Sequence, residues 1–198
     1  MVEYHLWTPL SEKDVRKLKI RDVVYISGVM FTARDSAHER ALEYFGEGRN
    51  LPIDTNGVAL FHSGPLVREV DGRYEVVSAG PTTSARMEVF EEVFIEKSGI
   101  RIIIGKGGMG AKTVEAMKKF GVVYCAFTGG TGALAAKAIK AVKSVEWLDL
   151  GMPEALWTLV VEDFGPLIVA IDSFGNNLYA NVMDQVEKNR LKIHQSID

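Results

Sequence analysis

The 198-residue sequence has little cysteine and no large excess of either charge. Its single cysteine, Cys125, cannot form an internal disulfide, and one thiolate cannot hold an iron–sulfur cluster, which takes about three or four. With 23 Lys and Arg against 26 Asp and Glu, the net charge of −3 argues against nucleic acid or an anionic membrane as a partner. We therefore expect no metal ligand in this chain and no polyanionic partner.

Long hydrophobic runs and a leader peptide are also missing. Charged residues interrupt the N-terminus from Glu3 onward, and the longest apolar stretches, such as Leu167–Ile171, are far shorter than the roughly 20 residues of a membrane span. The content of 47% hydrophobic and 25% charged residues is ordinary for a globular protein. We expect one domain over residues 1–198, located in the reducing cytoplasm.

Short β-branched runs alternate with segments of helical period, which predicts an α/β fold. The expected strands are Val23–Ile26, Val58–His62, Ile100–Ile104, Val122–Phe127 and Val145–Leu148, followed by Leu159–Ile171 as two strands separated by a turn at Gly165-Pro166. Asp71-Gly72 lies between two alternating runs and predicts an antiparallel hairpin over Val67–Val70 and Arg73–Val77.

Helices are expected between these strands. The segments are Thr32 as N-cap to Gly46, Ser84–Ser98, Gly110–Phe120, an Ala-rich stretch after Gly132, and Leu178–Lys192. The last three strand-and-helix units, up to Val145–Leu148, predict parallel pairing. An antiparallel component comes from the hairpin.

Three strand-to-helix junctions each combine small residues with one cation. They are Thr32–Asp35 with Arg34, Thr82–Arg86 with Arg86 itself, and Gly105–Gly108 with Lys106. Ligands of α/β sheets bind beyond the carboxyl ends of the strands, where helix N-termini offer free N–H groups and partial positive charge. The recurrence of a cation there predicts a small anionic ligand.

The loop Gly105–Gly110 fits the G-x-G-x-x-G pattern of dinucleotide sites. No acidic residue for the ribose follows at Cys125–Gly132, and Ala111 stands before Lys112 where a phosphate loop needs glycine. A non-catalytic nucleotide- or anion-binding module therefore remains only as an alternative function.

Several polar residues have two interpretations each. The hydroxyls of Thr82–Ser84 fit helix capping, and Asp35 fits either a capping box with Thr32, which we favour, or a pair with Arg34. His62 ends a strand and fits a general acid or, preferably, a structural histidine. The other predictions are surface positions for His38 and His194 and a buried, inert thiol for Cys125.

Taken together and in order, the motifs resemble the β subunit, or C-terminal domain, of class I fumarate hydratases, and also the related L-tartrate dehydratase β subunit. The matching segments are Thr32-Ala33-Arg34-Asp35, His62-Ser63-Gly64-Pro65, Gly80-Pro81-Thr82-Thr83-Ser84 with Arg86-Met87, Gly105-Lys106-Gly107-Gly108-Met109 and Asp149-Leu150-Gly151-Met152-Pro153-Glu154-Ala155. Ordered motifs over most of the chain are far more specific than the glycine loop alone.

This resemblance implies a swivelling β/β/α domain with a mixed sheet and flanking helices. It implies a hydro-lyase that interconverts fumarate and L-malate, with a separate α subunit holding a 4Fe-4S cluster whose open iron is a Lewis acid. It also implies that Thr82 is the base and that Arg34, Arg86 and Lys106 bind the dicarboxylate. Which of Asp35, His62 and Asp149 supports these cations is not encoded in the motifs, and Asp35 and His62 are the candidates we retain.

The same resemblance implies a hetero-oligomer that is inactive without the α subunit, with self-association an open question. The motifs do not separate fumarate from tartrate, because the same cations serve either dicarboxylate. A regulatory relative that has lost its α partner is a third, weaker reading.

Overall fold

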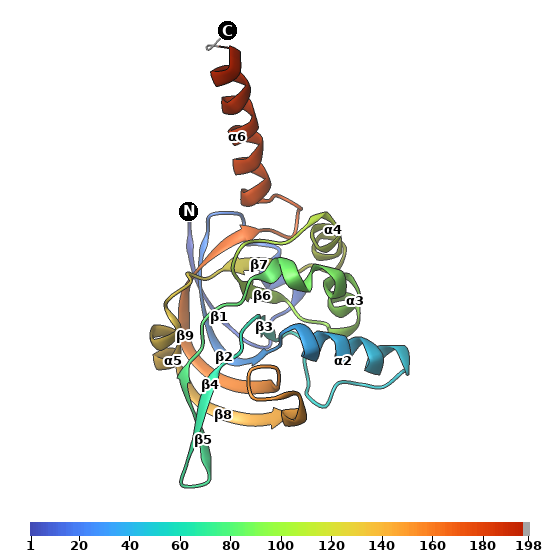
Figure 1. Ribbon diagram of the computed structural model, residues 1–198, viewed down its shortest axis with the longest axis vertical. Coiled ribbons are helices and arrows are strands. Elements are labelled where there is room, and N and C mark those ends of the chain that lie inside the picture. Colours follow the sequence, from blue (N-terminus) through green and yellow to red (C-terminus); the bar gives the residue numbers. More distant parts are fainter. Residues whose placement is uncertain (196–198) are drawn as a thin grey trace.

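The computed structural model describes the backbone of residues 1–195 and is built on one seven-stranded sheet. In spatial order the strands are β1 (Glu3–Trp7), β2 (Val23–Thr32), β3 (Ala59–Phe61), β6 (Ile102–Gly105), β7 (Val123–Ala126), β9 (Leu156–Ile171) and β8 (Ile139–Glu146). Strands β1 to β7 of this sheet pair in parallel, whereas β9 is antiparallel to β2, β7 and β8. Since β9 pairs with both β2 and β7, strands β2, β3, β6, β7 and β9 close into a ring (Figure 1).

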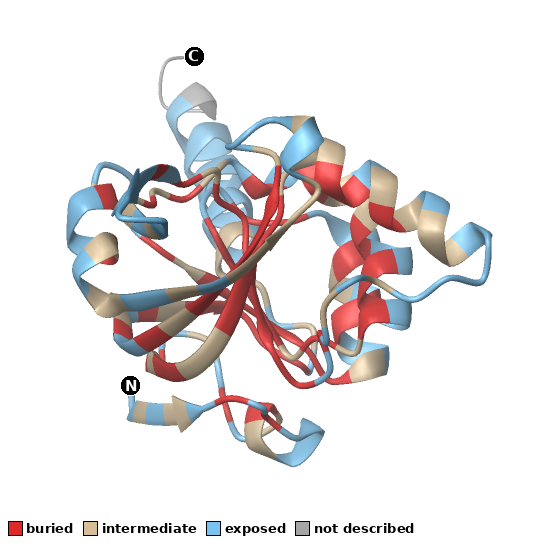
Figure 2. Ribbon diagram, turned by 90° about the horizontal axis from the view of Figure 1, so that it is seen from below, coloured by how far each residue is buried: buried red, intermediate tan, exposed pale blue. Residues whose placement is uncertain are grey.

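Successive side chains along each strand point to opposite faces of the sheet, and two hydrophobic cores result. Ile102 and Ile104 of β6 face the core inside the ring, while Ile103 faces the core outside it. Helices α2 (Asp35–Gly46), α3 (Glu88–Ser98) and α4 (Ala111–Phe120) cover the outer core, and short helices α1 (Glu12–Val15) and α5 (Gly132–Ala138) lie near the inner one. Figure 2 shows the buried residues concentrated in the strands and on the facing sides of these helices. The predicted mixed sheet with flanking helices is confirmed.

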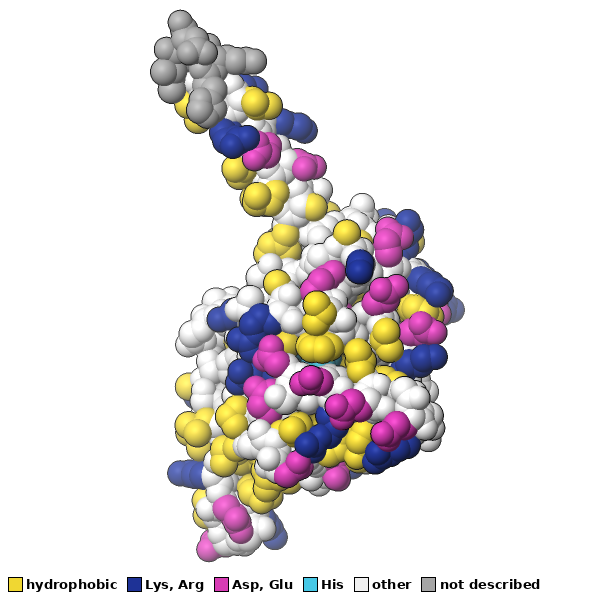
Figure 3. All heavy atoms as spheres, turned by 45° about the vertical axis from the view of Figure 1, so that its right-hand side comes forward, with side chains coloured by type: hydrophobic (Ala, Val, Ile, Leu, Met, Phe, Trp, Pro, Cys, Tyr) yellow, Lys and Arg dark blue, Asp and Glu magenta, His cyan; other side chains and the backbone are white. Residues whose placement is uncertain are grey.

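Two elements project from this body at opposite ends (Figure 1). One is the predicted hairpin of β4 (Leu66–Val70) and β5 (Arg73–Ser78), whose turn places Asp71 and Gly72 at φ angles of 50° and 72°. The other is α6 (Leu178–Gln195), which carries exposed apolar side chains along its length (Figure 3). Within residues 1–195, no helix is both long and apolar enough to cross a membrane.

Some predicted elements were wrong. Strand β8 lies at Ile139–Glu146 rather than Val145–Leu148, and it is antiparallel because its neighbour is the long return strand β9. Strand β9 runs through Gly165-Pro166 without a break, because register shifts in its pairing with β2 absorb the irregularity. Strand β1 and helix α1 were not predicted.

Thr32 is not a helix cap. It is the last residue of β2, fully buried, and its Oγ1 accepts a hydrogen bond from the backbone N–H of Trp157 at 3.3 Å. Helix α2 begins at Asp35 after Arg34, which caps it without a side-chain hydrogen bond. The threonine was misassigned because the strand extends further than its β-branched run predicts.

Candidate active site

The predicted site residues follow three adjacent parallel strands. Arg34 comes two residues after β2, His62 directly after β3, and Lys106 directly after β6. The register of these strands aligns their carboxyl ends, since Thr32 pairs with Phe61, which pairs with Ile104. One edge of the sheet therefore carries Arg34, His62 and Lys106.

Thr82 lies between the ends of β3 and β6. Its N–H donates to the carbonyl of His62 at 2.6 Å, and its carbonyl accepts from the N–H of Lys106 at 3.3 Å. The N–H of Ser84 then donates to the carbonyl of Lys106 at 2.9 Å. Residues Thr82–Ser84, the Thr82 segment, thus continue the backbone hydrogen bonding of the sheet between β3 and β6 and bring Thr82 beside Lys106. Thr82 is half-buried, and its hydroxyl has no hydrogen-bond partner within the described part of the chain.

Asp35 connects the two arginines. Arg86 donates to both of its carboxylate oxygens, from Nε to Oδ1 at 3.1 Å and from Nη2 to Oδ2, while Nε of Arg34 lies 3.9 Å from Oδ2. Partial burial opposes ionisation of Asp35, but the hydrogen bonds from Arg86, a backbone hydrogen bond and the attraction of both arginines together outweigh it and lower the pKa of the carboxyl. The favoured capping role of Asp35 is therefore wrong, and its main partner is Arg86.

Protein carboxylates already fill two of the helix N-termini at this edge. Glu154 accepts from the N–H of Ser36 at 3.0 Å at the start of α2, and it also lies 3.2 Å from Nε of Arg34. Glu88 accepts from the N–H of Gly110 at 2.6 Å and from the N–H and hydroxyl of Thr113 at the start of α4. Some of the N–H groups that the sequence predicted to be free therefore already bind protein carboxylates, so the side-chain cations are the main source of positive charge at the site.

Protein contacts also account for the glycines of the Gly105–Gly110 loop. A Cβ at Gly105 would collide with Oγ of Ser84, and one at Gly110 would lie 2.6 Å from Glu88. Gly107 has a φ of 83°, which disfavours any side chain. A phosphate at the start of α4 would have to displace Glu88, which weakens the nucleotide-binding alternative. Lys106 is exposed and has no ionic partner among the described residues.

A buried cluster of His38, His62 and Glu91 lies behind this edge. All three side chains are fully buried. Nε2 of His62 contacts Oε1 of Glu91 at 2.7 Å, and Nε2 of His38 lies 3.2 Å from the same oxygen. The predicted surface position of His38 is wrong, whereas the structural role favoured for His62 agrees with its burial and contacts.

Glu91 and His38 were missed by sequence reasoning. A signal was present for Glu91, because it lies four residues after Met87 and four before Ile95, on the buried stripe of α3. An acidic residue in an apolar stripe needs a buried partner. Nothing comparable marks His38, because the other buried residues of α2 are the small alanines Ala37 and Ala41.

Burial sets the ionisation of this cluster. Burial lowers the pKa of His62, which favours its neutral form. Burial opposes ionisation of Glu91 as well, but the attraction and hydrogen bonds of the two histidines prevail and lower its pKa to about 2. Glu91 is therefore a carboxylate that accepts a hydrogen bond from neutral His62.

The lowered pKa of His62 predicts that the folded protein loses stability in acid. In the unfolded chain His62 takes up a proton near pH 6.5, whereas in the folded protein it resists protonation, so unfolding is coupled to proton uptake. The free energy of unfolding therefore falls by up to about 1.4 kcal/mol for each pH unit below 6.5. His62→Gln should be less stable at pH 7.5 but should lose less stability between pH 7.5 and 5.5 in denaturant titrations.

The matched control is His5→Gln. Hydrogen bonds that exposed His5 donates to Asp163 and Glu3 raise its pKa, so its contribution to stability is present at low pH and is lost as pH rises. Its removal should leave the acid-induced loss as steep or make it steeper. If the free energy of unfolding depended equally on pH in the parent and in His62→Gln, the assignment of His62 as a buried neutral residue would be contradicted.

Cys125 lies inside the strand ring and is fully buried. Burial raises the pKa of its thiol to about 12, so the prediction of an inert thiol is confirmed. A buried thiol of this kind is no ligand for an iron–sulfur cluster, and this chain alone does not fit such a group. The side chain of His194 lies outside the described residues.

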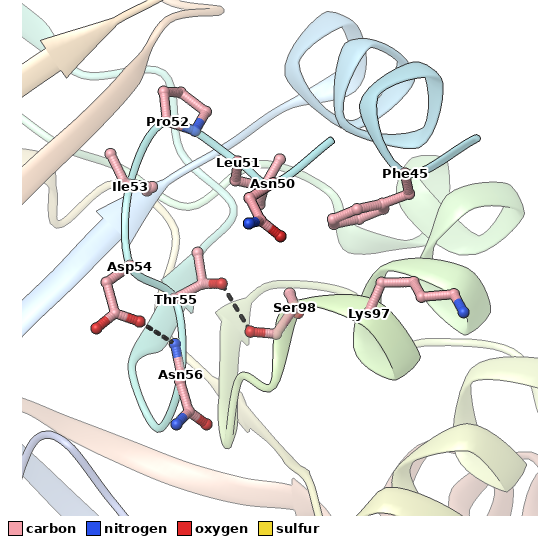
Figure 4. A pocket seen from close by; sticks show the side chains of 10 residues that line it. All are labelled: Phe45, Asn50, Leu51, Pro52, Ile53, Asp54, Thr55, Asn56, Lys97 and Ser98. Atoms are coloured by element: carbon pink, nitrogen blue, oxygen red, sulfur yellow. Dashed lines mark hydrogen bonds between the residues drawn. The ribbon is translucent and has the colours of Figure 1, made fainter. Parts of the chain in front are cut away.

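A surface hollow of about 420 Å³ lies at the other edge of the sheet (Figure 4). It is formed by the α2–β3 loop and the end of α3, and Thr55 donates to the carbonyl of Ser98 at 2.6 Å beside it. Lys97 is the only cation in its lining. This hollow does not belong to the site.

Comparisons with known proteins agree with the motifs. Residues 1–182 match the sequence model of the family described as "Fumarase C-terminus". The chain is 46% identical over 175 residues to the L(+)-tartrate dehydratase subunit beta of Escherichia coli (strain K12), covering 88% of this chain and 86% of that protein. A Methanocaldococcus jannaschii protein with the same name, given provisionally, is 46% identical over 183 residues, covering 92% and 94% of the two chains.

A third relative is longer. The Geobacillus stearothermophilus protein with the provisional name fumarate hydratase class I is 40% identical over 188 residues, which are 94% of this chain but 35% of that protein. The names of all three relatives denote enzymes that add or remove water. With most of its length matched by the family and by such relatives, this chain belongs to the fumarase C-terminal family of hydro-lyase subunits and domains.

Proposed function

We propose that this chain is the β subunit of an iron–sulfur hydro-lyase that interconverts fumarate and L-malate. The observation that carries the proposal is one sheet edge that combines cations at Arg34, Arg86 and Lys106 with Thr82, whose hydroxyl has no partner among the described residues. A substrate with two carboxylates carries a charge of about −2, which suits a site whose acidic groups are already engaged with arginines or helix ends.

The arginines and the lysine bind carboxylates with different geometry. Guanidinium groups bind carboxylates through two parallel hydrogen bonds, so Arg34 and Arg86 orient one end of the substrate, while Lys106 acts as a point charge beside Thr82. Binding requires Arg86 to share or exchange its contacts with Asp35. Since Asp35 holds Arg86 before substrate arrives, the guanidinium is positioned in advance.

Thr82 acts as the base in malate dehydration. Its Oγ, as the alkoxide, takes the proton from C3, the C–H electron pair forms the double bond, and hydroxide leaves from C2. An ordinary threonine hydroxyl is far too weak an acid for this role, so the ionised form requires the nearby positive charge of Lys106 and the arginines. The absence of another hydrogen-bond partner within the described residues leaves the Thr82 hydroxyl available for the substrate.

A partner subunit holds the 4Fe-4S cluster, which supplies a Lewis acid when bound. The inert Cys125 supports the proposal that another subunit holds the cluster. The Geobacillus relative supports it too, because about two thirds of that protein lie outside the match. The name "subunit beta" of the other relatives supports an α partner. We place this chain as a single swivelling domain that closes over the cluster in the cytoplasm.

L(+)-tartrate is the second candidate substrate. The observation in its favour is the 46% identity to a tartrate dehydratase subunit, against 40% to the relative named for fumarate hydratase. Tartrate differs from malate by one hydroxyl on the carbon that loses the proton, and both present two carboxylates to the same cations.

Reconstitution tests the proposal. The isolated chain should show no turnover, and addition of the cluster-loaded α subunit from the same source, under anaerobic conditions, should give dehydration of L-malate measured by the absorbance of fumarate. Parallel assays with L(+)-tartrate, detecting oxaloacetate, decide the substrate by kcat/KM. Turnover by the isolated chain, or no turnover of either acid by the complex, would refute it.

A further inference from the structure

A buried chain of hydrogen bonds runs from Glu91 to the Thr82 segment. Glu91 accepts from Nε2 of His62 at 2.7 Å, and Nδ1 of His62 accepts from the hydroxyl of Ser84 at 2.9 Å. Ser84 in turn accepts from the hydroxyl of Tyr124 at 3.1 Å. Neutral His62 satisfies both of its contacts, with Nε2–H as donor and Nδ1 as acceptor.

His62 holds the Thr82 segment at two points. Its carbonyl accepts from the N–H of Thr82 at 2.6 Å, and its ring binds the side chain of Ser84, two residues further on. Ser84 is fully buried, so this contact does not compete with water. The backbone on both sides of Thr83 is therefore fixed to the end of β3.

The other histidine of the cluster reaches Arg34. Nδ1 of His38 donates to the carbonyl of Arg34 at 2.7 Å, while its Nε2 faces the Glu91 oxygen that His62 also contacts. One buried carboxylate oxygen thus lies between two histidines, each of which holds the backbone of a proposed substrate-contacting residue.

We propose that Glu91, His62 and Ser84 are positioning residues that fix Thr82 relative to Arg34. The inference rests on the proposed function, because it concerns the geometry of that site. None of the three side chains reaches the open edge of the sheet, since all are fully buried. Their effect on the reaction is indirect and passes through the backbone of the Thr82 segment.

The same cluster has the composition of a metal site, with three ligand atoms within 4.8 Å of one another. The 2.7 Å separation between His62 and Glu91 is that of a hydrogen bond, shorter than the spacing of two ligands around a tetrahedral ion at about 2 Å from each. Hydrogen bonding also uses both nitrogens of His62, so we assign the cluster to positioning.

Ser84→Ala tests the inference in the reconstituted complex. It removes the side-chain contact between His62 and Ser84 without adding volume. Thr55→Val is the matched control, because it removes a buried hydroxyl bond at the opposite edge (Figure 4). Both variants should lose similar thermal stability. Only Ser84→Ala should lower kcat, by about 10- to 100-fold, because Thr82 is misplaced.

The kinetic isotope effect separates positioning from loss of folded protein. With substrate deuterated at the carbon that loses the proton, Ser84→Ala should raise the isotope effect on kcat, since a misplaced base slows proton removal itself. A smaller fraction of folded enzyme would leave that ratio unchanged. Glu91→Gln, which keeps the side-chain size, should act in the same direction as Ser84→Ala.

Each contrary outcome is distinguishable. A parent complex that turns over substrate, together with parent-like kcat and isotope effect in Ser84→Ala, would overturn the positioning role and leave the proposed function standing. Stoichiometric zinc in the purified parent chain, lost in Glu91→Gln, would also overturn it. No turnover of malate or tartrate by the parent complex would overturn the proposed function and this inference with it.

Discussion

Thr82→Ala is expected to lower kcat of the reconstituted complex by about 10²- to 10⁴-fold, the usual contribution of a general base. The substitution removes only the hydroxyl and one methyl group of a half-buried side chain. The backbone bonds of residue 82 to His62 and Lys106 do not involve the side chain and should persist. Initial rates with malate measure the loss.

Binding should be nearly unaffected by the same change. Succinate lacks the leaving hydroxyl, so its inhibition constant reports dicarboxylate binding alone, and it should change by no more than about twofold in Thr82→Ala. Thr83→Ala is the matched control, because it removes an adjacent, more exposed hydroxyl on the same segment. If Thr82→Ala retained parental kcat, Thr82 would have no part in proton transfer.

Local sequence signals were sufficient for most of the fold. Short apolar runs bounded by polar and glycine residues specified β3, β6 and β7, and Asp71-Gly72 specified the hairpin. The closing of the ring was beyond such signals, because it depends on β9 pairing with β2 across more than a hundred residues. The antiparallel direction of β8 follows from the same long-range pairing.

The candidate site was predictable in its position but less so in its internal contacts. Strand ends carry their junction residues to one edge in any parallel sheet, so Arg34 and Lys106 could be placed there from sequence. The partners of these residues could not, because Asp35 reaches Arg86 from another helix and Glu88 reaches α4 from α3. Such pairs need the packing of helices, which no local pattern contains.

Replacement of Lys106 by methionine is the second large effect we expect. A hydrogen bond to a charged group contributes about 1.5–3 kcal/mol, which corresponds to a rise of about 10- to 100-fold in the succinate inhibition constant and in KM. Methionine keeps an unbranched chain of similar length, and the backbone bonds of residue 106 to Thr82 and Ser84 do not involve the side chain and should survive.

Lys112→Met separates direct contact from general electrostatics. Lys112 is exposed at the start of α4, and its removal changes the net charge by the same amount. If Lys106 touches the substrate, only its replacement should weaken succinate binding, and the difference should persist at 0.5 M salt, where the Debye length falls to about 4 Å. If both variants lost succinate affinity equally, and high salt abolished the loss, Lys106 would act only through the electrostatic potential of the whole protein. The three-cation site would then lack its contact beside Thr82, and the alkoxide would have to depend on Arg34 and Arg86 alone.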